Sequence, residues 1–488
     1  MNMKLRLLGA KRYILLIIAS LLLSGCTIDN RYAAEKALWK AEQDIKKIID
    51  KTSGKPKDRD LSEIISAYRK VVDKYPLEPL SAKTQFAIAS AYLSWNKPEE
   101  AQRELKKVIQ NFSGQPQIAA RAQFAIGKIF ESQGKTAEAL SEYEKVTDIY
   151  PLSNDGLESP LYIIRMQKNL KNKEGEERAY RNAARHYKKL IDEYSDTDIA
   201  LYVRDYLART QVEEGDWQSA ISLWDEIVAK APESSMALKA FLARAEIYAT
   251  KLNDLKKAVS IYEEFTERYP KSGVIQQARF RLGELYLLSN EPSKAKDIFS
   301  GIIKESSKDE ELTIRARLAY IETLKRQKLT DEVIAEYKKI EELYPKNPLS
   351  LGIPFLISRF YAEIKDTALA AKTLDQAASE YEKRLASSGN DNEHRAIARL
   401  LMLCYNDARS WDKLLKLLGD LSDRFQNDPS FLMAMASLYQ TQLRQPEKAV
   451  ATYQKILERF PENERFVKMA QAQIESLKRP SSEPKIEN

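Results

Sequence analysis

The chain has 488 residues, of which 31% are charged and only 15 are glycine, and its abundance of Ala, Leu, Glu, Lys and Gln predicts a helical protein. The 78 basic and 71 acidic residues give a net charge of +7, with no basic run, so charge gives no argument for nucleic-acid binding. The two cysteines leave little room for a disulfide framework.

The first 25 residues have the layout of a secretory signal peptide. Tyr13 to Leu23 form an apolar run of 11 residues, followed by the small residues Ser24 and Gly25. This run is shorter than the ~20 apolar residues of a membrane-spanning helix. The basic residues before and at the start of the run are Lys4, Arg6, Lys11 and Arg12. Removal of residues 1–25 takes these four charges and no acid, which lowers the net charge from +7 to +3.

The sequence Leu23-Ser24-Gly25-Cys26 resembles the lipobox of bacterial lipoproteins. This resemblance implies cleavage before Cys26 and attachment of two or three acyl chains to it, which anchor a protein stably to a membrane. Thr27 follows the cysteine, whereas an Asp at that place holds enterobacterial lipoproteins at the inner membrane. We therefore expect a lipid-anchored protein of the cell outer membrane that faces the periplasm. Residues 26–60 would hold the anchored N-terminus and the first helix.

Residues 61–462 form a repeat with a period of about 38 residues. Tyr-Pro, Phe-Pro or an equivalent pair ends each unit, and Pro cannot continue a helix. The second residues of these pairs stand at 76, 113, 151, 195, 232, 270, 307, 345, 382, 426 and 461. Eleven units thus follow one another. Two steps are 44 residues long, and we expect a polar break at Lys171–Glu177, between helical segments Pro160–Leu170 and Ala179–Tyr194, and a polar loop at Ser387–Glu393.

Each unit places apolar and small residues at helical spacing in two successive segments. In one unit, Ile126 and Gly127 lie on the first helix, and Ala139 and Tyr143 lie on the second. The small residues allow the two helices to approach closely. This pattern resembles the tetratricopeptide repeat (TPR), and the resemblance implies an all-α, right-handed superhelical solenoid of about eleven helix pairs. We expect residues 463–478 to form a capping helix and residues 479–488 a disordered tail.

The residues that chemistry needs are scarce. We expect His186 on a second helix and His394 in a loop, and with Cys404 they are too few and too scattered for a metal set. Cys404 is interpreted as a small buried hydrophobe, with a reactive thiol as the alternative. The sequence has no phosphate-binding loop, no G-x-S-x-G and no H-E-x-x-H. We expect a protein that is not an enzyme and that uses no cofactor and no metal.

The first helix of each TPR pair lines the concave face, so a partner is expected there. An apolar position recurs on these helices at Phe86, Phe124, Phe280 and Phe355. Nearby positions carry the cations Arg121, Lys128, Arg209 and Arg359. Such a row would hold a protein partner or a peptide segment through apolar anchors and carboxylate or backbone contacts. The alternative is that the phenylalanines pack between helices and the charges serve solubility.

The stretch from Tyr75 to Tyr92, Y-P-L-E-P-L-S-A-K-T-Q-F-A-I-A-S-A-Y, resembles BamD, the TPR lipoprotein family of the outer-membrane β-barrel assembly machine. The resemblance implies a periplasmic scaffold in outer-membrane protein assembly or envelope maintenance. A second hypothesis is an accessory scaffold of exopolysaccharide export. A third, an envelope enzyme that acts on the cell wall, is disfavoured because the catalytic residues are missing.

Overall fold

A computed structural model describes residues 31–49, 58–76, 79–306 and 308–478 of the chain. In these ranges every regular element is a helix, which confirms the prediction of an all-α fold. The expected signal peptide, Cys26 and the expected C-terminal tail lie outside the described residues.

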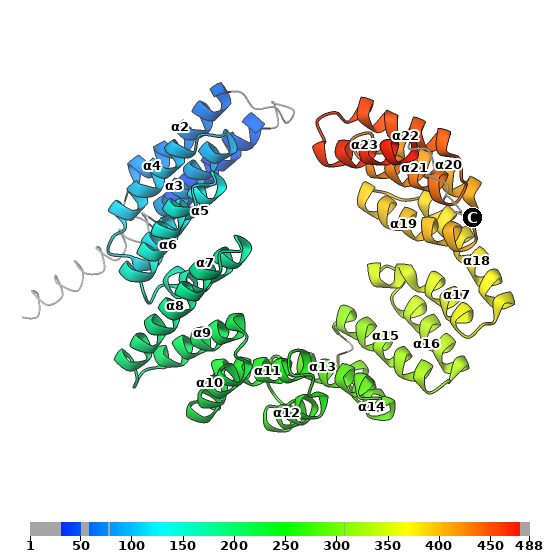
Figure 1. The fold of residues 1–488 in the computed structure, drawn as a ribbon, viewed down its shortest axis with the longest axis horizontal. Helices are drawn as coiled ribbons and strands as arrows, with labels where there is room; N and C mark the ends of the chain where they lie inside the picture. Colours follow the sequence, from blue (N-terminus) through cyan, green and yellow to red (C-terminus); the bar gives the residue numbers. More distant parts are fainter. Residues whose placement is uncertain (1–30, 50–57, 77–78, 307, 479–488) are drawn as a thin grey trace, which may run out of the picture. The chain divides into compact units, whose positions relative to one another are not determined.

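The helices fall into two compact units, Met1–Ala258 and Val259–Asn488. Figure 1 shows the helices in chain order, each hairpin followed directly by the next. A helix over residues 31–49 comes first. Unit 1 then contains α2 (Asp58–Lys74), α3 (Pro79–Ser94), α4 (Pro98–Asn111), α5 (Pro116–Ser132), α6 (Thr136–Ile149), α7 (Asn154–Asn169), α8 (Lys173–Glu193), α9 (Asp198–Glu214), α10 (Trp217–Lys230) and α11 (Ser235–Thr250).

The boundary between the units falls within α12 (Leu255–Arg268). Unit 2 contains α13 (Ile275–Leu288), α14 (Pro292–Glu305), α15 (Glu310–Arg326), α16 (Thr330–Leu343), the 3₁₀ helix η1 (Pro348–Gly352), α17 (Ile353–Glu363), α18 (Thr367–Ala386), α19 (Asp391–Asp407), α20 (Trp411–Arg424), α21 (Ser430–Thr441), α22 (Pro446–Arg459) and α23 (Glu464–Lys478). In chain order the described helices make eleven pairs followed by α23, as the repeat predicts.

Within each unit a helix packs against the next one in the chain, and neighbouring first helices, such as α5 and α7 or α7 and α9, also touch. The core is therefore a series of apolar clusters, each shared by two or three successive helices. One such cluster joins Ala101 and Leu105 of α4 to Ile126 of α5. Short repeats stacked in this way depend mainly on contacts with their neighbours.

Close approach within a pair depends on a small residue on the first helix opposite a large one on the second. A Cβ added to Gly127 would lie 2.5 Å from the ring of Tyr143, and one added to Gly283 would lie 2.6 Å from the ring of Phe299. The equivalent residues of the α3–α4 pair, Ala89 and Leu105, share one buried cluster. Alanine thus stands opposite leucine, whereas glycine stands opposite an aromatic ring.

The turn between the two helices of a pair contains one residue in the left-handed region. Glycine fills it in two described turns, at Gly134 and Gly215. The other members of this set have a side chain, although positive φ is unfavourable for such residues. They are Asn96, Lys171, Asn253, Asn290, Lys328, Lys365, Arg409 and Arg444. The set follows the steps of the sequence repeat, so each described turn has a positive-φ residue at the equivalent place.

The expected polar break at Lys171–Glu177 is wrong. The second helix α8 begins at Lys173 and runs for 21 residues, whereas α6 and α10 have 14 each. Seven residues make about two turns of an α-helix, so the insertion lengthens α8 without rotating its apolar face away from the core. The first helix α7 also begins at Asn154, six positions before Pro160, which lies inside it.

The second long step is absorbed in a similar way. The second helix α18 has 20 residues and ends at Ala386. The expected loop Ser387–Glu393 is shorter than predicted, because α19 starts at Asp391. His394 therefore lies in the first turn of α19 and not in a loop, and its Nδ1 is 2.7 Å from the hydroxyl of Ser388.

Candidate partner-binding surface

Phe124 on α5 lies in a group of three aromatic rings. Its ring centroid is 4.9 Å from that of Tyr143 on α6 and 5.2 Å from that of Tyr162 on α7. Tyr143 is buried, whereas Phe124 is half-buried. Phe124 therefore packs between two repeats and leaves part of its ring exposed.

Glu131 closes this aromatic group on its polar side. It accepts hydrogen bonds from the hydroxyl of Tyr143 at 2.8 Å, from that of Tyr162 at 2.6 Å and from Nζ of Lys128 at 3.1 Å. Burial raises the pKa of Glu131, but these three donors outweigh it and hold the pKa below its ordinary value. Lys128 also donates to Tyr162 at 2.6 Å, so this predicted binding residue bridges α5 and α7.

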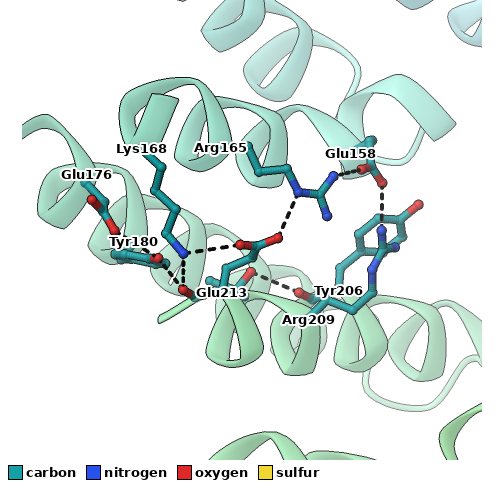
Figure 2. A network of polar contacts seen from close by, with 9 residues as sticks. Glu158, Arg165, Lys168, Glu176, Tyr180, Tyr206, Arg209 and Glu213 are labelled. Carbon is teal, nitrogen blue, oxygen red and sulfur yellow. Dashed lines mark hydrogen bonds and ion pairs between the residues drawn. The ribbon is translucent and has the colours of Figure 1, made fainter. Parts of the chain in front are cut away.

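A second polar network joins α7, α8 and α9 (Figure 2). Arg165 on α7 donates to Glu213 on α9 at 2.9 Å and to Glu158 at 3.2 Å. Lys168 lies 3.2 Å from the Glu213 carboxylate, and Tyr180 on α8 donates to the Glu213 carbonyl at 2.6 Å. Burial raises the pKa of Glu213, but the bonds from Arg165 and Lys168 reverse the shift and hold it below its ordinary value.

The predicted cations of unit 1 connect neighbouring first helices. Arg121 on α5 lies 3.0 Å from Asp155 on α7, and Arg209 on α9 lies 3.3 Å from Glu158 on α7. The Arg209 guanidinium also lies 4.8 Å from the ring centroid of Tyr206. Arg121 keeps 62% of its side chain exposed and Lys128 keeps 49%, so both still face solvent.

Phe86, on α3, packs against the cluster that α3, α4 and α5 share and is half-buried. It lies in a different cluster from Phe124. The two predicted phenylalanines of unit 1 thus lie in successive repeats and pack in separate clusters.

Unit 2 repeats this arrangement. Phe280 on α13 packs edge-to-face against Phe299 with centroids 5.4 Å apart, and the Arg315 guanidinium lies 5.1 Å from its ring centroid. Phe355 on α17 packs against the cluster around Tyr381. Arg359 on α17 lies 3.0 Å from Asp407 on α19 and keeps 61% of its side chain exposed.

Sequence reasoning found these cations and rings but not the acids that hold them. Asp155 lies 34 positions from Arg121, and Glu158 lies 51 positions from Arg209. Each contact joins two repeats, so it depends on the register of the stack. The sequence feature that could have predicted these acidic partners is the presence of an acid on the first helix of each neighbouring repeat.

The structure gives little support for chemistry among the described residues. No group of three or more His, Cys, Asp or Glu side chains there is arranged to hold a metal ion, and none of the helices has the length and apolar character to cross a membrane. Cys404 is buried, as interpreted from the sequence, and burial raises the pKa of its thiol to about 12. At neutral pH the nucleophilic thiolate is therefore scarce.

Comparisons with known families agree with the helix pairs. The tetratricopeptide repeat model matches residues 202–234, 239–272 and 431–463. Three segments of the chain thus match this repeat. The model for soluble NSF attachment protein (SNAP) matches residues 65–214. TPR stacks are in general protein-binding scaffolds that present extended surfaces.

Solved structures of similar fold share little sequence with this chain. Yeast Tom70 is 12% identical, with 89% of this chain and 96% of that chain covered and a TM-score of 0.34. A tetratricopeptide repeat protein from Parabacteroides merdae is 16% identical, with 56% and 98% covered and a TM-score of 0.29. No curated protein matches the sequence. Likenesses at this level carry no argument about function.

Proposed function

We propose that the protein is a periplasm-facing, lipid-anchored TPR scaffold that binds protein partners in outer-membrane protein assembly or envelope maintenance. The observation that carries the binding proposal is the recurrence of exposed cations and half-buried rings on the first helices of both units. Their packing and ion pairs fix their positions before a partner arrives, which reduces the entropy lost on binding.

The binding residues proposed are Phe86, Phe124, Phe280, Phe355, Arg121, Lys128, Arg209 and Arg359. The rings would supply apolar contact area through their exposed edges. The cations, already paired on one side, would meet acidic or carbonyl groups of the partner on the other. Cys26 would carry the lipid and hold this surface at the membrane.

A crosslinking pull-down of the membrane-bound protein tests the pathway. The proposal expects recovery of components of the barrel-assembly machine or of envelope maintenance. Recovery of a polysaccharide synthase with its export barrel would instead assign the protein to exopolysaccharide export. Turnover of a cell-wall substrate by the purified chain would contradict the non-enzymatic assignment.

A further inference from the structure

A groove of about 660 Å³ lies between the second helices α6 and α8, and the first helix α7 also lines it. None of the cations described in the preceding sections lines it. Leu140 of α6 and Ile163 of α7 supply apolar surface to the groove. All three helices belong to unit 1.

The groove results from the sequence of α8. Gly175, Ala179 and Ala183 stand four residues apart, so they occupy one face of the helix, and all three line the groove. Their small side chains leave space that larger ones would fill. A Cβ at Gly175 would lie 2.5 Å from Oε1 of Gln167 on α7, so a larger residue there would displace the end of the Gln167 side chain.

The two walls of the groove carry opposite charges. Arg185 and Lys189, four residues apart on α8, make no ion pair with any described residue. Glu144 and Asp148, four residues apart on α6, are also without an ion-pair partner in the described ranges. These four groups line one groove without meeting across it. A ligand that fits between the walls can therefore pair with either of them.

His186 provides a polar group that the protein itself leaves without a partner. Its imidazole lines the groove between Arg185 and Lys189, and its Nε2 is buried with no hydrogen-bond partner among the described residues. An unpaired buried polar group is unfavourable, and a ligand that bonded to it would remove this cost.

We propose that this groove binds a peptide segment of a partner protein, with acidic side chains directed at α8 and an apolar side chain placed between Leu140 and Ile163. The carboxylates would meet Arg185 and Lys189, while Glu144 and Asp148 would repel them and so fix the orientation of the segment. The shallow depression beside the groove extends this basic wall through Arg181 and Lys188. A flat membrane surface would meet the exposed cations but would not fill the groove.

This second binding surface goes beyond the proposed function, because none of the first-helix residues proposed above to bind a partner lines it. A phage-displayed library of random twelve-residue peptides, selected against the full-length chain, tests it without a known ligand. Asn182→Trp fills the groove from an exposed position on α8. The matched control is Glu193→Trp, an exposed residue at the end of the same helix that does not line the groove.

We expect the selected peptides to be rich in Asp and Glu with at least one apolar residue. Their affinity for Glu193→Trp should equal that for the wild type, whereas their affinity for Asn182→Trp should fall about tenfold or more. Their affinity for the double variant Arg185→Glu, Lys189→Glu should fall to a similar extent. Circular dichroism melting of each variant verifies that the fold is retained, and charge reversal alone serves if Asn182→Trp does not fold.

Several results would overturn the proposal. These are peptides rich in Lys and Arg, equal retention by Asn182→Trp and Glu193→Trp, or no peptides selected at all. Vesicles of phosphatidylglycerol provide the last arm. In one outcome the vesicles bind the wild type and Asn182→Trp equally but fail to bind the double variant Arg185→Glu, Lys189→Glu. If in addition no acidic peptide is selected, the basic wall binds lipid and not a peptide.

Discussion

At the residue scale, the tightest contact within a pair joins a glycine of the first helix to an aromatic ring of the second. Gly283 and Phe299 form the simplest example, because Phe299 has no polar group and is completely buried. In the Ala89–Leu105 pair, leucine on the second helix is smaller than an aromatic residue, and the first helix has alanine in place of glycine.

Gly283→Ala should therefore lower the free energy of unfolding by about 1–3 kcal/mol, because overpacking outweighs the gain in helix propensity of about 1 kcal/mol. Combined with Phe299→Leu, the same change should cost much less than the two single changes together. Urea unfolding of the four chains measures the coupling. Additive single effects would show that the ring does not press on Gly283.

The Glu213 carboxylate links α9 to α7 through Arg165 and Lys168, and its pKa is depressed in the folded state. A depressed pKa stabilises the fold at pH values above that of the unfolded carboxylate, and this contribution is lost as the pH falls through the folded value.

Glu213→Gln should cost about 1–3 kcal/mol at pH 7, and the difference from wild type should shrink below about pH 5. Thermal melting at a series of pH values measures it. Glu214→Gln, at the exposed neighbouring position, is the control and should melt like wild type at every pH. A pH-independent deficit for Glu213→Gln would contradict the role given to its charge.

At the element scale, the turn between the helices of a pair is the feature most open to improvement. Lys328 has a φ of 59°, in the left-handed region, whereas Gly134 has 72° in the equivalent turn. A side chain at such a position costs about 1–2 kcal/mol, and glycine loses about 0.5–1 kcal/mol through its unfolded-state entropy.

Lys328→Gly should therefore stabilise the protein by about 0.5 kcal/mol. Gly134→Ala should destabilise it by about 1 kcal/mol, although an added Cβ there meets nothing within 4 Å. Chemical unfolding of both variants measures this pair of opposite effects. Loss of stability in Lys328→Gly would mean that its side chain contributes more than the backbone costs.

The helix pairs could be predicted because small, large and apolar residues recur at helical spacing through the whole repeat. The extension of α8 could not, because a polar segment that contains Gly175 is typical of a loop. The structure stabilises this segment by a cap from Asn172 to the Gly175 amide at 3.1 Å and by the pair Arg178–Glu174 at 3.2 Å. The contact of Gly175 with Gln167 depends on tertiary packing.

The sequence predicted only part of the candidate surface, because it shows repeated positions but not the contacts between repeats. Equivalent positions in successive repeats revealed Phe124, Arg121 and Arg209. Their partners, Asp155 and Glu158, come from neighbouring repeats and depend on how the repeats stack. The groove beside α8 could not be predicted, because it follows from the extension of that helix.

At the scale of the whole molecule, the proposal places a stack of repeats at a membrane through one residue. Cys26 stands before the first described helix, so its substitution should leave the helical content unchanged. Cys26→Ser should release the protein, or its uncleaved precursor, from the outer-membrane fraction. Membrane fractionation with circular dichroism measures both effects. A processed Cys26→Ser chain that stays in the outer membrane would contradict lipid anchoring.

The central claim is that the first helices bind a protein partner, and site-specific photo-crosslinking in cells tests it most directly. One variant carries a photoreactive side chain in place of Arg121 on the first helix α5, and the other in place of Lys106, an exposed residue of the second helix α4. We predict that the chain with the probe at Arg121 crosslinks to a discrete protein and that the chain with the probe at Lys106 does not. Equal crosslinking at both positions, or crosslinking at Lys106 alone, would contradict the account.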